Sequence, residues 1–241
     1  FKQLPYVVGL EDNRMRASAG QQAYVRGLQG AQAGQRYAVL RPTVRYGQPK
    51  PSDDLDERGN VTPFTGDLWR SYVASSDRHE LLGYERAQVA TGTITRVGNG
   101  EHETSTLLLQ ASGREVRAGD RLIPEPPRAF MNYMPHAPPT EVDARVVSIY
   151  GSGAMVNAAQ NQVIAINLGE QDGIQTGHVL HLMTQGDRIK DTTDPSRPTI
   201  KLPSESNGVA IVFRVFDRIA YALILDVRNT VRVGDRLVNP Q

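Results

Sequence analysis

The fold is decided by the last stretch of the chain, Thr230-Val231-Arg232-Val233-Gly234-Asp235-Arg236-Leu237-Val238-Asn239-Pro240. A close copy occurs earlier, as Glu115-Val116-Arg117-Ala118-Gly119-Asp120-Arg121-Leu122-Ile123-Pro124. Each copy has an apolar approach, a Gly-Asp pair suited to a turn, and a short Arg-Leu strand that a proline ends. The pattern predicts one closing hairpin that the chain uses twice.

The similarity extends beyond this stretch to most of the chain. Residues 6–10 resemble residues 145–149, and residues 34–40 resemble residues 177–182. The segments are short, rich in β-branched residues and bounded by Gly, Asp or Asn, and none shows a helical period. We therefore predict an all-β fold of two related small β-barrel-like domains in tandem, joined by a proline-rich connector.

Matched positions also locate the differences between the copies. The offset falls from 143 at Gly34 and Gly177 to 125 at Gly83 and Gly208, which predicts a longer connection in the first copy. The predicted domains are a first β domain over 1–126 with an inserted loop at about 42–81, a connector over 127–143, and a second β domain over 144–241. The connector is predicted to be extended, because six prolines fall between Pro124 and Pro139.

Composition argues against several classes of function. The 241 residues include 27 basic and 26 acidic residues with no basic stripe, so nucleic-acid binding is not expected. There is no cysteine, hence no disulfide framework or thiolate site. No apolar run approaches the roughly 18 residues of a membrane helix, and no signal peptide opens the chain, so no direct membrane span is expected.

Catalytic and metal-binding patterns are also missing. His178 and His181 are three residues apart on a predicted strand, so their side chains point to opposite faces and cannot share one metal ion. Asp120 and Asp235 are explained by their turns, where Asp bonds its neighbouring backbone. We predict no catalytic residue, no cofactor and no metal site, and therefore a protein that is not an enzyme.

Candidate partner-interface residues are apolar side chains in the two irregular segments. Those in the inserted loop are Phe64, Trp69 and Tyr72, and those in the connector are Phe130, Met131 and Tyr133. Aromatic side chains are favoured at interface hot spots. The alternative is that the connector residues pack onto one of the chain's own barrels, and that Trp69 fills a core or belongs to an added edge strand.

The second copy resembles a known domain. The residues that carry the resemblance are Arg145-Val146-Val147-Ser148-Ile149-Tyr150-Gly151, Gly169-Glu170-Gln171-Asp172-Gly173-Ile174-Gln175-Thr176-Gly177-His178-Val179-Leu180, Val212-Phe213-Arg214-Val215-Phe216-Asp217-Arg218 and Val233-Gly234-Asp235-Arg236-Leu237. They are similar to the C-terminal domain of the flagellar ring protein FlgT, in the version found in the TsaP family of LysM-containing type IV pilus secretin-associated proteins. The first copy resembles the segment between that family's LysM module and its FlgT-like end.

The resemblance implies a non-enzymatic periplasmic scaffold or adaptor that associates with the outer-membrane type IV pilus secretin, PilQ, and helps anchor it to the cell wall. Peptidoglycan binding belongs to the family's LysM module, which is not in this sequence. Copies are expected to form a homo-oligomeric ring that follows the symmetry of the secretin. The alternative is an envelope glycan (peptidoglycan)-binding module with Trp69 and Tyr72 as its stacking platform.

Overall fold

The computed structural model describes residues 3–48, 80–99, 102–125, 133–150, 157–184, 186 and 188–240. The chain divides into two compact units, and each contains a closed β-barrel. Helix is limited, in the described residues, to two single turns of 3-10 helix at Glu11–Asn13 and Glu170–Asp172. The prediction of an all-β chain with two related barrels in tandem is confirmed.

The first barrel is formed by six strands: β1 (Tyr6–Leu10), β2 (Gln22–Arg26), β3 (Arg36–Gly47), β4 (Leu81–Arg96), β5 (Ser105–Ser112) and β6 (Arg121–Pro124). Around the barrel their order is β1-β2-β5-β4-β3-β6, and β6 returns to pair with β1. Closure of this kind leaves no exposed sheet edge in the barrel wall.

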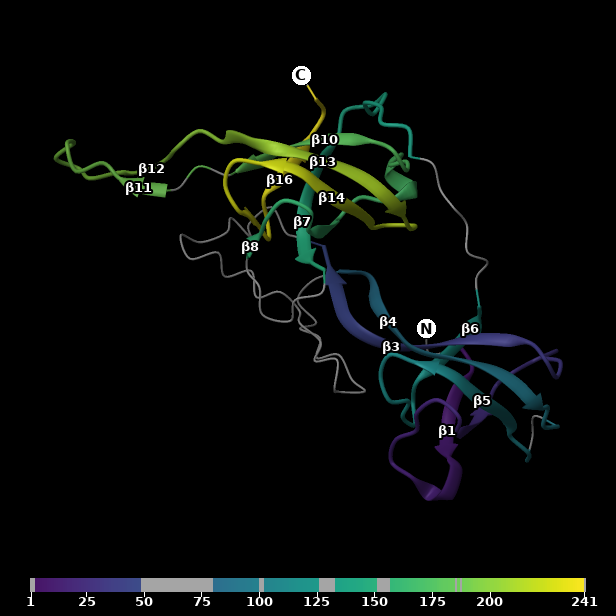
Figure 1. The fold of residues 1–241 in the computed structure, drawn as a ribbon. Coiled ribbons are helices and arrows are strands. Elements are labelled where there is room, and N and C mark those ends of the chain that lie inside the picture. Colours follow the sequence, from purple (N-terminus) through teal and green to yellow (C-terminus); the bar gives the residue numbers. More distant parts are fainter. Residues whose placement is uncertain are drawn as a thin grey trace. The chain divides into compact units, whose positions relative to one another are not determined.

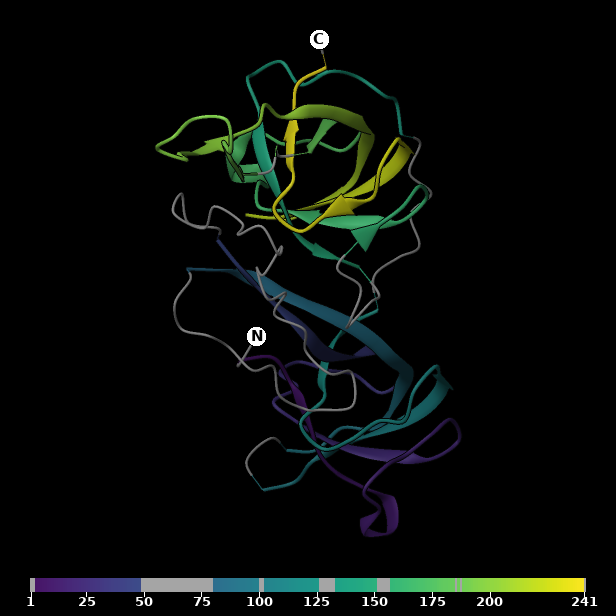
Figure 2. The same ribbon diagram turned by 90° about the vertical axis from the view of Figure 1, so that its left-hand side faces the viewer.

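The second barrel repeats this topology with β7 (Asp143–Ile149), β9 (Val163–Ile166), β10 (Val179–Thr184), β13 (Glu205–Val215), β14 (Ala220–Val227) and β16 (Arg236–Val238). Its order is β7-β9-β14-β13-β10-β16, which matches the first barrel strand for strand. Figures 1 and 2 show these strands curving around a common interior. The internal repeat is therefore a repeat of connectivity as well as of sequence.

The irregularities of the two barrels match as well. β1 has a bulge between Val7 and Gly9, and β7 has one between Val146 and Ser148. Of the two bulges in β4, one begins at Ile94, and the equivalent bulge in β13 begins at Val212. The predicted match of Gly83 with Gly208 is therefore wrong, because Ile94 and Val212 set a different offset along this strand.

The repeated Gly-Asp stretch is a corner and not the predicted hairpin. The segment before the corner, β15 (Val231–Arg232), pairs with β8 (Asn157–Ala158), whereas β16 after it pairs with β7 and β10. In the first barrel Val116 likewise bridges Ala17, while β6 pairs with β1 and β3. The two arms of each stretch therefore have different partners, and the Gly-Asp pair turns the chain between them.

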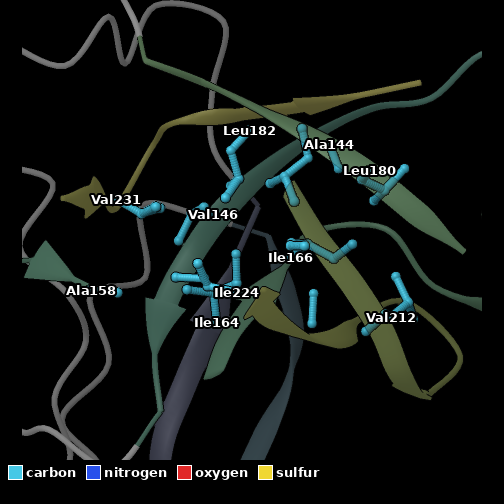
Figure 3. Close-up of a cluster of buried hydrophobic side chains, with 14 of the residues drawn as sticks. Ala144, Val146, Ala158, Ile164, Ile166, Leu180, Leu182, Val212, Ile224 and Val231 are labelled. Atoms are coloured by element: carbon cyan, nitrogen blue, oxygen red, sulfur yellow. The ribbon is translucent and has the colours of Figure 1, made fainter. Parts of the chain in front are cut away.

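Each barrel is filled by its own cluster of buried, mostly aliphatic side chains. In the second barrel these come from every strand of the wall, and Figure 3 shows several of them converging on the interior. They include Ala144, Val146, Ile164, Ile166, Leu180, Leu182, Val212, Ile224 and Leu237, all of them buried. Alternate residues along each strand supply the core, as expected for a small barrel.

A buried ion pair joins the third strand of the first barrel to its Gly-Asp corner. Arg41 of β3 is 1% exposed and donates two hydrogen bonds to the carboxylate of Asp120, from Nε (2.8 Å) and from Nη2 (2.7 Å). The strand register places Thr184 of β10 at the equivalent position beside Asp235. The first barrel thus holds a buried, bidentate ion pair at a position where the second barrel has a threonine beside the aspartate.

The largest differences in length lie between the third and fourth strands. β3 continues through Pro42 to Gly47, beyond the predicted start of the loop at residue 42. The last described pair between β3 and β6 joins Leu40 to Arg121, and past that point one edge of β3 needs no ladder partner, so a proline is tolerated. The second barrel carries at this place a projecting arm, the hairpin of β11 (Arg188–Lys190) and β12 (Thr199–Lys201) (Figure 1).

We expect Arg41→Ala to lower the free energy of unfolding by about 3–5 kcal/mol, because it leaves the carboxylate of Asp120 buried without its ion-pair partner. Urea unfolding measures the change. Arg16→Ala is the matched control in the same barrel, since Arg16 forms an exposed ion pair with Glu115 (2.8 Å) and its loss should cost less than about 1 kcal/mol. Equal losses for the two variants would contradict the assignment.

Candidate partner-binding surface

The structure describes one of the six predicted interface residues. Tyr133 lies in the connector and is 42% exposed, and its neighbour Met134 is 77% exposed. The other five lie outside the described residues: Phe64, Trp69, Tyr72, Phe130 and Met131. The predicted partner surface is thus represented in the structure by the connector.

The connector is bound to the second barrel through its backbone. The N–H of His136 donates to the carbonyl of Gly177 (3.0 Å), and the N–H of Val179 donates to the carbonyl of His136 (2.9 Å). Farther along, the side-chain amide of Asn239 donates to the carbonyl of Thr140 (2.8 Å) and accepts from the N–H of Val142 (2.6 Å). Because backbone groups hold the connector, the side chains of Tyr133 and Met134 remain available to a partner.

Gly177 is required where the connector crosses the barrel. Its φ is +97°, and a Cβ there would lie 2.5 Å from the carbonyl oxygen of Met134. Gly34, the matching residue of the first barrel, also has a positive φ (+90°), but a Cβ there would meet nothing within 4 Å. The turn itself thus favours glycine in both barrels, whereas only the second barrel needs glycine for the close approach of another segment.

The next residue, His178, is a buried polar group beneath the connector. It is 0% exposed, its Nδ1 accepts the N–H of Gln175 (3.2 Å), and its ring packs edge-on against His136 with 4.9 Å between centroids. Burial, and secondarily the charge of His136, lowers the pKa of His178 below its ordinary value of 6.5. In the first barrel Gln35 accepts the N–H of Gln32 at the matching turn and is exposed.

The projecting arm is a second candidate surface, and sequence patterns did not single it out. Its cross-strand pair Ile189 and Ile200 is exposed, each at 42%, and Leu202 just beyond β12 is 40% exposed. Residues directly opposite in an antiparallel pair share a face, so the two isoleucines form one apolar side of the hairpin. The opposite side carries Lys190 and Lys201, which are both exposed.

A third feature is a cluster of aromatic rings on the second barrel, at the turn between β13 and β14. The ring of Tyr221 lies 5.4 Å from that of Phe216, 5.8 Å from that of Tyr150 and 6.4 Å from that of Phe213. Tyr150 and Phe216 are 50% and 41% exposed. The sequence signal that could have found this cluster is the placing of Phe213, Phe216 and Tyr221 on either side of Asp217-Arg218.

Possible metal ligands do not gather within the described part of the chain. No three His, Cys, Asp or Glu side chains in it are placed to hold a metal ion. His136 and His178, which do approach each other, are joined by packing and by the connector's backbone bonds. No described helix has the length and apolar character needed to cross a bilayer.

The chain was compared with models of known protein families and with curated proteins. Neither comparison found a match.

Gly177→Ala should destabilise the protein more than Gly34→Ala. Both changes impose a strained positive φ that costs about 1 kcal/mol or more, but only the first also forces the connector away from the barrel. Hydrogen exchange provides the readout. We expect the amides of His136 and Val179 to lose protection in Gly177→Ala alone, and equal protection in the two variants would contradict the close approach.

Acidification should destabilise the second barrel through His178. Because its folded pKa is depressed, the unfolded state binds the proton more readily, so stability is full above about pH 6.5 and falls as the pH drops below that value. Protonation would also place an N–H donor at Nδ1 of His178. That donor would face the N–H of Gln175, so the present hydrogen bond from Gln175 to Nδ1 would be lost. Urea unfolding between pH 8 and 5 should show this loss in the parent chain and a flatter profile in His178→Gln, since Gln35 already performs the same acceptor role.

Proposed function

We propose that this chain is a non-enzymatic scaffold of the periplasm that associates with the outer-membrane type IV pilus secretin PilQ. The observation that carries the proposal is the pair of topologically identical barrels, of which the second has the motifs that resemble the FlgT-like domain of the TsaP family. Cell-wall anchoring would come from that family's LysM module, and the residues present here would supply the contact with the secretin.

The connector supports this role by its construction. Backbone hydrogen bonds hold it to the second barrel at His136, while Tyr133 and Met134 keep exposed apolar side chains. Rigid presentation of apolar and aromatic side chains lowers the ordering cost of binding a partner. Exposed apolar side chains of this kind are what a protein-docking surface requires, and such a surface does not require catalytic groups.

The proposal predicts that a tagged form of this chain recovers PilQ from envelope extracts. The double variant Tyr133→Ser/Met134→Ser should reduce recovery roughly fivefold or more if these side chains are a hot spot. Met15→Ser is a matched control, because Met15 is 89% exposed on the first unit and is not part of the connector. Failure of the parent chain to recover any secretin would reject the proposal.

Within the scaffold role, we further propose that copies form a ring following the rotational symmetry of the secretin, because each equivalent surface of the channel can recruit one copy or one pair. Two-dimensional averages of the secretin with and without the protein should differ by repeated peripheral density. A single peripheral copy would contradict this arrangement.

A second candidate function, binding of envelope glycan, is favoured by the aromatic cluster, because Tyr150 and Phe216 present partly exposed rings. Retention on purified sacculi would support it. The scaffold proposal expects no retention by this chain.

A further inference from the structure

The projecting arm is too small to be a stable structure by itself. Its ladder has three residue pairs, and among the described residues it forms a sheet of two strands only. An isolated two-stranded hairpin is marginally stable in water, and further strands with a covered apolar face are needed to stabilise it. The exposed Ile189 and Ile200 are the face that such a partner would cover.

The hydrogen-bond pattern shows which backbone groups face outward. The N–H of Asp191 donates to the carbonyl of Pro198 (2.9 Å), so residues 191 and 198 form a hydrogen-bonded pair. Pairs alternate along an antiparallel ladder, so Lys190 and Thr199 form a non-bonded pair whose N–H and C=O groups point away from the hairpin. The outer edge of β11 therefore offers the backbone groups of Lys190 to a third strand.

The two faces of the hairpin specify the side chains of that strand. One face is aliphatic, with Ile189 and Ile200, and the other carries Lys190 and Lys201. Neither β11 nor β12 contains an acidic residue, and within the described part of the chain the ammonium group of Lys190 has no ion-pair partner. A strand that pairs with β11 would place successive side chains on alternate faces, aliphatic beside the isoleucines and acidic beside Lys190.

We propose that the β11–β12 arm binds an extended segment of another protein, in which aliphatic and acidic side chains alternate, by adding it as a third strand to the outer edge of β11. Main-chain hydrogen bonds would supply affinity, and the two-faced side-chain pattern would supply selectivity. No described strand pairs with the outer edge of β11, and this favours a polypeptide over a lipid surface, because a bilayer offers no partner for backbone N–H and C=O groups. The inference goes beyond the proposed scaffold role, since it holds for any partner with this pattern.

The test uses the full chain, labelled with ¹⁵N, and a blocked synthetic peptide of alternating valine and glutamate. We expect shift changes confined to residues 188–202, and no binding of the matched peptide in which lysine replaces glutamate. Lys190→Glu should weaken binding about fivefold to tenfold, because it replaces an attractive cross-strand pair with a repulsive one. Equal binding of the two peptides would overturn the proposal.

Proline substitutions test whether the peptide pairs with the outer edge of β11 and not with that of β12. Lys190→Pro removes the outward N–H of β11 and spares the bonds between β11 and β12, so it should abolish peptide binding. Thr199→Pro is the matched change on the other edge and should leave binding intact. Retention of the cross-strand contact between Ile189 and Ile200 by NMR shows that each variant keeps the hairpin, and binding by Lys190→Pro with the hairpin intact would overturn the proposal.

Other occupants give other results. Binding of the arm to phosphatidylglycerol vesicles but not to the peptide would indicate a lipid surface, and arm-dependent dimers in sedimentation without peptide would indicate a second copy; either result overturns the proposal. If the chain recovers PilQ but does not bind the peptide, this inference fails and the scaffold role stands. If it binds the peptide but recovers no PilQ, the scaffold role fails instead.

Discussion

A six-stranded barrel closes only when its last strand pairs with its first, and in both units this closure depends on one Gly-Asp corner. The carboxylate of Asp120 accepts the N–H of Arg117 (2.9 Å), and that of Asp235 accepts the N–H of Arg232 (2.8 Å). The backbone of the same residues then reaches the first strand, where Val7 donates to Asp120 (2.8 Å) and Val146 donates to Asp235 (2.9 Å). Glycine takes the positive φ, +92° at Gly119 and +96° at Gly234, that turns the last strand into the ladder.

Much of the fold could be predicted because strand period and turn residues are local signals. The alternation of apolar residues located the strands, and the repeated order of elements indicated two barrels. The corner was mistaken for a hairpin because Gly-Asp has the same turn chemistry in both, and only the distant partner β8 separates them. The length of β3 was underestimated because a proline usually ends a strand, whereas Pro42 lies past the last described pair with β6, where one edge of β3 needs no ladder partner.

The candidate surface was harder to predict, since backbone pairing leaves little trace in side chains. Six prolines indicated an extended connector, but nothing in the residues around His136 shows that its peptide groups pair with those of Gly177 and Val179. The arm was missed for a different reason: three residues per strand give too short a period to recognise. The difference in burial between exposed Gln35 and buried His178 could not be predicted either. It arises because the connector covers the turn at His178, whereas no described segment covers the matching turn at Gln35.

Both insertions between the third and fourth strands begin and end on neighbouring residues. The N–H of Gln48 donates to the carbonyl of Glu80 (2.8 Å) in the first copy, and Thr184 pairs with Glu205 in the second. Because the barrel strands already hold the two ends of the insertion together, the entropic cost of closing the loop rises only slowly as the insertion becomes longer. The connection between the third and fourth strands is therefore a position where segments of different length and chemistry can be inserted without changing the register of the barrel strands. In this way one barrel fold can acquire different binding specificities.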